Sequence, residues 1–192
     1  MSLKIICGCM FSGKTTELIN INNKLSSIHK KVLNIKSSLD NRYFIDNIST
    51  HNMSKIECIT LNKLKDVPSN FYKDNEYIII DECQFFDDLY EFVINAIDKD
   101  NKNVILIGLN GDSNRNNFGE LYKLYPHADD IKLLKAFCSI CNNGKKAIYS
   151  KKIVNNDSII DIGEKDKYIP VCRKCYNDED DEDDEYFLYN YF

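Results

Sequence analysis

The sequence has no long apolar run, and its first residues do not predict a leader. No stretch of its 192 residues approaches the roughly 18 to 20 apolar residues that span a bilayer. The N-terminal residues Met1 to Lys4 run into a short apolar segment and lack the longer apolar region and cleavage site of a signal peptide. We therefore expect a cytoplasmic protein with no membrane partner.

The sequence also lacks an excess of positive charge. The net charge is −5, but eight of the 30 acidic residues form one unbroken run, Asp178 to Glu185. Outside that run, 22 acidic residues stand against 25 basic ones, so the body carries +3. Neither value predicts a surface for nucleic acid, whereas a mildly basic body suits a small anionic ligand. The run itself predicts a solvated, disordered tail.

Short apolar segments alternate with helical patterns along most of the chain. Helical spacing of apolar residues predicts helices at Lys14–Ile28 and Phe86–Ile97. The predicted strands are Leu3–Cys7, Lys31–Lys36, Tyr77–Ile80, Asn103–Leu109 and Ile131–Phe137. The third and fourth strands show no polar alternation, which is typical of a parallel sheet covered on both faces. We therefore predict an α/β fold of the P-loop (RecA-like) type, a parallel sheet flanked by helices.

Residues 8–15 (GCMFSGKT) fit the phosphate-binding pattern G-x-x-x-x-G-K-[ST]. Glycines let backbone N–H groups approach a phosphate, and the N-terminus of the next helix completes the anion cradle. In this pattern Lys14 contacts the transferred phosphates and Thr15 offers a hydroxyl to Mg²⁺. A chance match is the alternative, and the strand before the loop argues against it. The predicted ATP-binding residues are Gly8, Cys9, Met10, Phe11, Ser12, Gly13, Lys14 and Thr15.

Two carboxylates, Asp81 and Glu82, follow the apolar strand Tyr77–Ile80. P-loop enzymes place an Asp at such a strand end to hold Mg²⁺ or its waters, and Asp81 fits that role. Glu82 is suited to accept the proton of a hydroxyl that attacks the γ-phosphate. A plain helix N-cap is the alternative for this pair.

Four of the eight cysteines form two C-x-x-C pairs, Cys138–Cys141 and Cys172–Cys175. Disulfides, redox-active pairs and unpaired buried thiols are the alternatives. Two such pairs with no secretion signal favour structural Zn²⁺ bound by four sulfurs. The 30 residues between the pairs form a loop pinned at both ends, and loops of this length are often lids. The three histidines lie far from these pairs, and we interpret Cys7, Cys9, Cys58 and Cys83 as packing residues.

Taken together, these motifs resemble those of the type II thymidine kinases, the compact cellular and viral kind. The resemblance extends to Tyr176 and rests on four motifs in the family's order and spacing. They are residues 8–18 (GCMFSGKTTEL), 81–86 (DECQFF), 109–119 (LNGDSNRNNFG) and 167–176 (KYIPVCRKCY). We therefore expect a P-loop kinase domain over residues 1–136, a zinc-binding lasso domain over 137–176 and an acidic-aromatic tail over 177–192.

The resemblance implies an ATP:thymidine 5′-phosphotransferase. Such an enzyme makes dTMP for DNA synthesis by nucleotide salvage, and deoxyuridine is an expected second acceptor. Glu82 would be the catalytic base. Further ATP contacts are implied for Asp40, Asn41 and Arg42, and for Asp81, Glu82, Cys83 and Gln84. The family also implies a homotetramer.

The long loop, Asn142 to Val171, resembles the family's lasso, which folds over the base. The resemblance places its backbone contacts to the pyrimidine at Ile159, Ile160, Asp161, Ile162 and Gly163. Tyr168 matches a ring that packs near the sugar and base, although an ordinary half-buried aromatic is the alternative. Further pocket candidates are Met10, Leu109, Ser113 and Ser150.

Several residues depart from the family's pattern. Cys83 replaces a usual Gly, Asn110 replaces an Asp, and Ser113 stands where a pocket aromatic is common. The segment Asn142–Gly144 lengthens the first zinc turn. These departures leave the preference between thymidine and deoxyuridine open. The rival interpretations are another P-loop NTPase and a zinc-ribbon module that binds nucleic acid; the second has only the support of Lys145, Lys146, Lys151 and Lys152.

Overall fold

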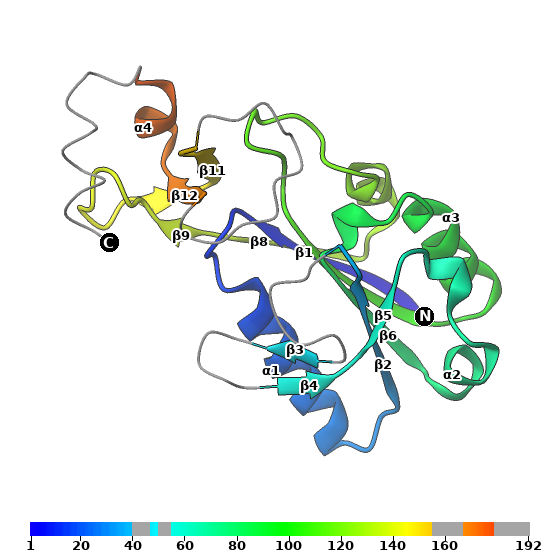
Figure 1. The fold of residues 1–192 in the computed structure, drawn as a ribbon. Helices are drawn as coiled ribbons and strands as arrows, with labels where there is room; N and C mark the ends of the chain where they lie inside the picture. Colours follow the sequence, from blue (N-terminus) through cyan, green and yellow to red (C-terminus); the bar gives the residue numbers. More distant parts are fainter. Residues whose placement is uncertain (40–46, 50–54, 155–166, 179–192) are drawn as a thin grey trace.

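The computed structural model describes residues 1–39, 47–49, 55–154 and 167–178. Figure 1 shows the arrangement of the helices and strands. Up to the end of the large sheet, the elements are β1 (Ser2–Gly8), α1 (Lys14–Ser27), β2 (Val32–Ser37), β3 (Asn47–Ser49), β4 (Lys55–Glu57), β5 (Ile59–Leu61), η1 (Leu64–Asp66), α2 (Ser69–Asp74), β6 (Tyr77–Asp81), η2 (Cys83–Phe85), α3 (Leu89–Ile94), η3 (Asn95–Lys99), β7 (Asn103–Gly108), η4 (Leu121–His127) and β8 (Asp130–Leu134).

The large sheet has six strands in the order β5-β2-β6-β7-β1-β8, and every neighbouring pair is parallel. The predicted α/β class with a parallel sheet flanked by helices is therefore confirmed. Because all strands run the same way, their carboxyl ends meet at one edge. The segments that follow β1, β6 and β7 therefore lie near one another.

Helices cover both faces of this sheet, and alternate strand residues pack against them. On one face, Ile5 of β1 belongs to a buried cluster with Leu89 and Val93 of α3. On the other face, the next residue, Ile6, packs with Leu18 of α1. Full burial of such a side chain contributes about 1.5–3 kcal/mol, so this two-sided core holds the strand ends in place.

The C-terminal elements form a smaller unit next to the carboxyl end of β8 (Figure 1). They are β9 (Ala136–Phe137), β10 (Lys146–Ala147), β11 (Tyr149–Lys152), β12 (Tyr168–Val171) and α4 (Arg173–Asn177). β9 pairs with β10 and β11 with β12, both antiparallel. The predicted boundary between residues 136 and 137 falls within β9, and residues 179–192 of the predicted tail lie outside the described part of the chain.

Two predicted elements differ from the observed ones. The helix predicted from Phe86 begins at Leu89, because Phe86 is extended after the short turn η2 and is buried without being helical. Its C-terminal part continues as a π-helical turn, η3. The strand predicted over Ile131–Phe137 divides after Leu134, and its last two residues pair with β10 in a different sheet.

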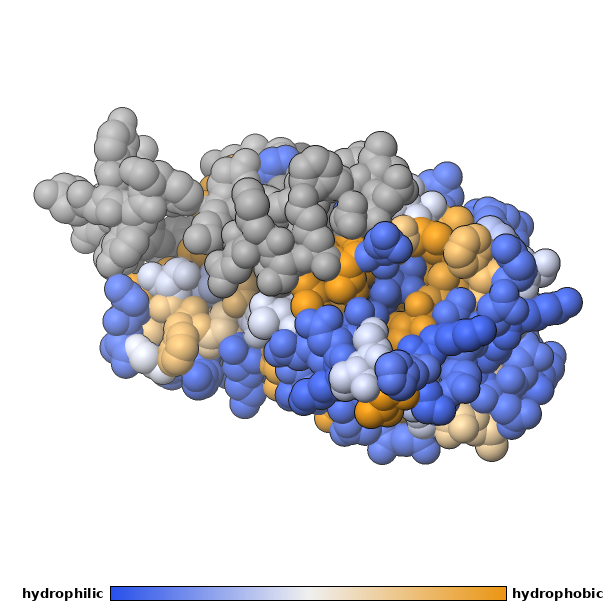
Figure 2. All heavy atoms as spheres, turned by 90° about the horizontal axis from the view of Figure 1, so that it is seen from below, coloured by the Kyte–Doolittle hydropathy of each residue, from blue (hydrophilic) through white to orange (hydrophobic). Residues whose placement is uncertain are grey.

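The surface of the described residues carries apolar side chains at scattered positions. On the face drawn in Figure 2, hydrophilic residues cover most of the described surface and hydrophobic ones form separate smaller areas. None of the helices in the described ranges is long and apolar enough to cross a bilayer.

The burial of Leu89 predicts that Leu89→Ala destabilises the protein far more than Leu133→Ala does. Leu89 is fully buried under the sheet, whereas Leu133 on the edge strand β8 is 47% exposed. We expect a loss of about 2–5 kcal/mol for Leu89→Ala and within about 0.5 kcal/mol for Leu133→Ala. Urea unfolding followed by circular dichroism measures both; equal losses would contradict the assigned core.

Candidate active site

The loop between β1 and α1 needs glycine at both of its ends. Gly13, the residue before α1, is left-handed with φ 85°. A Cβ on Gly8 would lie 2.5 Å from the carbonyl oxygen of Leu134 and 2.6 Å from Ser12 Oγ. Side chains at these two positions are therefore strained or excluded, and the backbone N–H groups stay accessible to an anion.

Lys14 lies back across this loop. Its side chain is 9% exposed, and its Nζ donates a hydrogen bond to the carbonyl oxygen of Cys9 at 2.9 Å. Ser12 Oγ is buried without a hydrogen-bond partner among the described residues. An ammonium and an orphaned hydroxyl at the N-terminus of a helix fit the oxygens of a bound phosphate.

Asp81 and Glu82 lie at the same sheet edge, two strands away from β1. Asp81 ends β6 and is 5% exposed, and its Oδ1 accepts the backbone N–H of Glu82 at 3.0 Å. Glu82 is left-handed, with φ 48° and ψ 42°. This turn directs the chain away from β6 directly after the carboxylate of Asp81. Asp81 and Thr15 are the residues that could hold Mg²⁺ between them.

Lys36, which was not predicted as a site residue from the sequence, lies beside Asp81 in the sheet. Lys36 lies on β2 in register with Asp81 and is 2% exposed. Opposite charges at paired positions offset part of the free-energy cost of burying both. The signal was present in the sequence, because a lysine near the end of an apolar strand is an unusual core residue.

The three cysteines near this edge are packing residues. Burial raises the pKa of the Cys7 and Cys9 thiols, and burial together with the charges of Glu82 and Asp81 raises that of Cys83 well above its usual value. These thiols stay protonated at neutral pH and are poor nucleophiles. Gly108 makes room for one of them, since a Cβ there would lie 2.8 Å from Cys83 Sγ.

The four predicted zinc ligands come together in the C-terminal unit. The Sγ atoms of Cys138, Cys141, Cys172 and Cys175 all lie within 4.8 Å of one another. Burial alone would raise the pKa of Cys138, but backbone N–H donors of Cys141 and Cys172 lower it to about 7. Four thiols clustered this closely fit a tetrahedral Zn²⁺ site.

The C-terminal unit contacts the phosphate loop directly. Ser150 Oγ of β11 accepts the backbone N–H of Met10 at 3.0 Å, and Cys9 Sγ donates to the carbonyl oxygen of Ala147 at 3.5 Å. Cys9 also belongs to the same buried cluster as Cys138 and Cys172. The cysteine cluster and the phosphate loop therefore share one small core.

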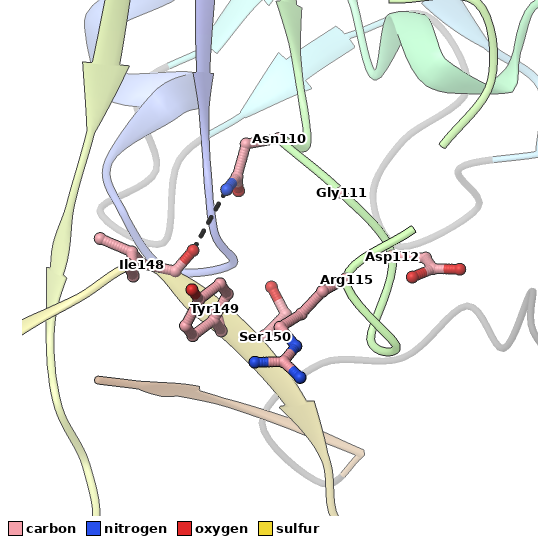
Figure 3. Close-up of a pocket in the computed structure, with 7 residues that line it drawn as sticks. All are labelled: Asn110, Gly111, Asp112, Arg115, Ile148, Tyr149 and Ser150. Carbon is pink, nitrogen blue, oxygen red and sulfur yellow. Dashed lines mark hydrogen bonds between the residues drawn. The ribbon is translucent and has the colours of Figure 1, made fainter. Parts of the chain in front are cut away.

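A small hollow, partly open to solvent, lies between the segment after β7 and β11 (Figure 3). In this view Asn110 points to Ile148, whose carbonyl oxygen accepts its Nδ2 at 3.1 Å. The Arg115 guanidinium lies 4.3 Å from the ring centroid of Tyr176, and the Tyr176 hydroxyl donates to the carbonyl oxygen of Ser113 at 2.6 Å. These contacts bind the segment after β7 to the C-terminal unit. The hollow is lined by Asn110, Gly111, Asp112, Arg115, Ile148, Tyr149 and Ser150.

The remaining predicted site residues divide into two groups. Met10, Leu109 and Ser113 lie in the loops after β1 and β7, and Tyr168 is buried on β12. The others lie outside the described residues, so their predicted roles stay predictions. These are Asp40, Asn41 and Arg42 in one segment, and Ile159, Ile160, Asp161, Ile162 and Gly163 in the other.

Comparisons with known proteins place these motifs in one family. The family model described as thymidine kinase matches residues 1–176. A thymidine kinase of Choristoneura fumiferana entomopoxvirus is 42% identical over 188 residues, covering 93% of this chain and 97% of that protein. One from Amsacta moorei entomopoxvirus is 40% identical, covering 92% and 98%. One from rice, Oryza sativa subsp. japonica, is 38% identical, covering 92% of this chain and 66% of the rice protein.

The cysteine geometry predicts that Cys172→Ser removes the metal. We expect about one zinc per chain in the unsubstituted protein and less than half of that in the variant, because three thiolates and a hydroxyl bind Zn²⁺ much more weakly. Elemental analysis of the purified full chain measures this. Cys58→Ser, a half-buried cysteine outside the cluster, is the matched control and should keep its zinc; equal zinc in both variants would disprove the site.

Proposed function

The chain belongs to the thymidine kinase family, and we propose that it transfers the γ-phosphate of ATP to the 5′-hydroxyl of thymidine. Deoxyuridine is the second acceptor, and the product dTMP supplies DNA synthesis by salvage. One observation carries the proposal: the phosphate loop and the Asp81–Glu82 turn lie at the same edge of the sheet. The C-terminal unit, which contains the four-cysteine cluster, packs against the phosphate loop.

The phosphate loop binds the nucleotide. Its backbone N–H groups, the Ser12 hydroxyl and the Lys14 ammonium take the phosphate oxygens, which replace the Cys9 carbonyl as the partner of Lys14. Mg²⁺, held by Thr15 and Asp81, supplies positive charge for the phosphates when it is bound. The predicted contacts of Asp40, Asn41 and Arg42 with the transferred phosphate belong to the same proposal.

Glu82 accepts the proton of the 5′-hydroxyl as that oxygen attacks phosphorus. Glu82 has a left-handed backbone conformation and no longer continues β6. The two adjacent carboxylates can therefore contact different partners. Asp81 serves the metal, while Glu82 serves the acceptor. A general base of this kind contributes about 10²- to 10⁴-fold to the rate.

The nucleoside lies between the segment after β7 and the C-terminal unit. Met10, Leu109 and Ser113 form one wall, and the ring of Tyr168 forms another. The backbone of residues 159–163 binds the pyrimidine, as the family resemblance implies. Cys138, Cys141, Cys172 and Cys175 would hold a structural Zn²⁺ and so fix both ends of this lasso. The active form is a cytoplasmic homotetramer.

A panel of nucleosides as phosphate acceptors tests the proposed function. We expect ADP release with thymidine and deoxyuridine at least about 100-fold faster than with ribonucleosides or without nucleoside, because the acceptor hydroxyl is positioned only in the right complex. A coupled ADP assay measures it. Equal ADP release without nucleoside would instead indicate a P-loop NTPase of another kind.

Glu82→Gln should bind both substrates and lose most turnover. The amide keeps the size of the side chain but cannot accept a proton, so we expect kcat to fall by about 10²- to 10⁴-fold with the KM for ATP within about threefold. Steady-state kinetics measures both constants. Glu76→Gln, which removes an exposed ion pair with Lys30, is the control and should keep full activity; near-normal turnover in Glu82→Gln would exclude Glu82 as the base.

A further inference from the structure

Gln84 connects the segment that carries Asp81 and Glu82 with the segment that follows β7. Its side chain is 3% exposed. Its Nε2 donates to Glu82 Oε2 at 2.6 Å, and its Oε1 accepts the backbone N–H of Leu109 at 3.1 Å. One buried amide therefore touches both the carboxylate of the proposed base and the first residue after β7.

The orientation of this amide is determined by its partners. A backbone N–H can only donate, so the atom facing Leu109 must be the oxygen Oε1. The nitrogen Nε2 then faces Glu82 and donates to the carboxylate. Flipping the amide would place oxygen against carboxylate and N–H against N–H, two repulsive contacts in a buried site.

Two glycines leave the space that Gln84 occupies. A Cβ on Gly108, the last residue of β7, would lie 2.8 Å from Gln84 Oε1. A Cβ on Gly119 would lie 2.1 Å from the backbone oxygen of Gln84, and Gly119 itself is left-handed with φ 63°. The side chain and the backbone of Gln84 are thus enclosed by the glycines at the two ends of the nucleoside loop, the segment 109–118 that follows β7.

We infer that Gln84 is a positioning residue for phosphoryl transfer, in place of the direct ATP contact implied by the resemblance. Its amide holds the Glu82 carboxylate in one rotamer and ties that carboxylate to Leu109 at the start of the nucleoside loop. Acceptor binding and orientation of the base are then coupled through a single side chain. This inference rests on the proposed function, in which Glu82 takes the 5′-hydroxyl proton.

Gln84→Met in the full chain tests this role. Methionine is close in size but makes neither hydrogen bond. We expect kcat to fall by about 10- to 100-fold, the range for losing a hydrogen bond to a charged group, and the KM for thymidine to rise. The KM for ATP should stay within about twofold, because the phosphate loop is untouched. Gln84→Asn, whose amide is one methylene too short to span both partners, should show the same kcat loss in a folded protein.

Asn34→Ala is the matched control for the loss of a buried amide. Asn34 on β2 is 8% exposed and donates to the carbonyl oxygen of Glu57 at 3.1 Å, away from the proposed base. We expect a lower Tm with kcat within about twofold of the unsubstituted chain. If Gln84→Met behaves like this control, with a lower Tm and unchanged kcat, Gln84 is structural and the inference is wrong.

A double-mutant cycle with Glu82→Asp separates positioning from a general loss of stability. If Gln84 acts through Glu82, Gln84→Met should cost at least about fivefold less in kcat once Glu82 has been shortened away from it. Additive losses would overturn the inference while leaving the proposed function intact. Failure of the unsubstituted chain to phosphorylate thymidine would instead overturn the proposed function and this inference with it.

Discussion

The parallel alignment of β1, β6 and β7 is the constraint on which the rest of the site depends. These strands are neighbours in the sheet and end at the same edge, so the phosphate loop, the Asp81–Glu82 turn and the segment after β7 meet there. The middle strand ends in Gly108, whose missing side chain leaves room for Cys83 and Gln84. Parallel pairing brings the ends of these strands together, and the absence of a side chain at Gly108 lets Cys83 and Gln84 pack against β7.

The C-terminal unit adds a second constraint on the same loop. Cys9 contributes to the buried cluster around the four cysteines, and Met10 donates its backbone N–H to Ser150. A metal bound at the cysteines therefore stabilises a core that the phosphate loop shares. In small units with little apolar surface, metal binding supplies folding free energy that the core alone does not.

Much of the fold was predictable because its main strands are continuous apolar runs that only a buried sheet accommodates, as in Tyr77–Ile80. The phosphate loop, the acidic pair and the cysteine cluster were predictable because each needs several residue types at fixed spacing. Three-residue strands such as β5 (Ile59–Leu61) carry too little pattern to be found. The start of the helix was predicted wrongly at Phe86, because an apolar residue at helical spacing can also be buried in an extended segment after a turn. The partners of Gln84 depend on which strands are neighbours, and no local pattern contains that information.

The buried charges at this edge explain why the site is built on the sheet and not on loops alone. Lys14, Lys36 and Asp81 are each less than one-tenth exposed. Withdrawing them from water destabilises the fold unless opposite charges and hydrogen bonds compensate. The large core on both faces of the sheet provides the stability that tolerates this cost. In return, the charges keep fixed positions in surroundings where water screens them little, and this is the condition under which they act most strongly on a charged ligand.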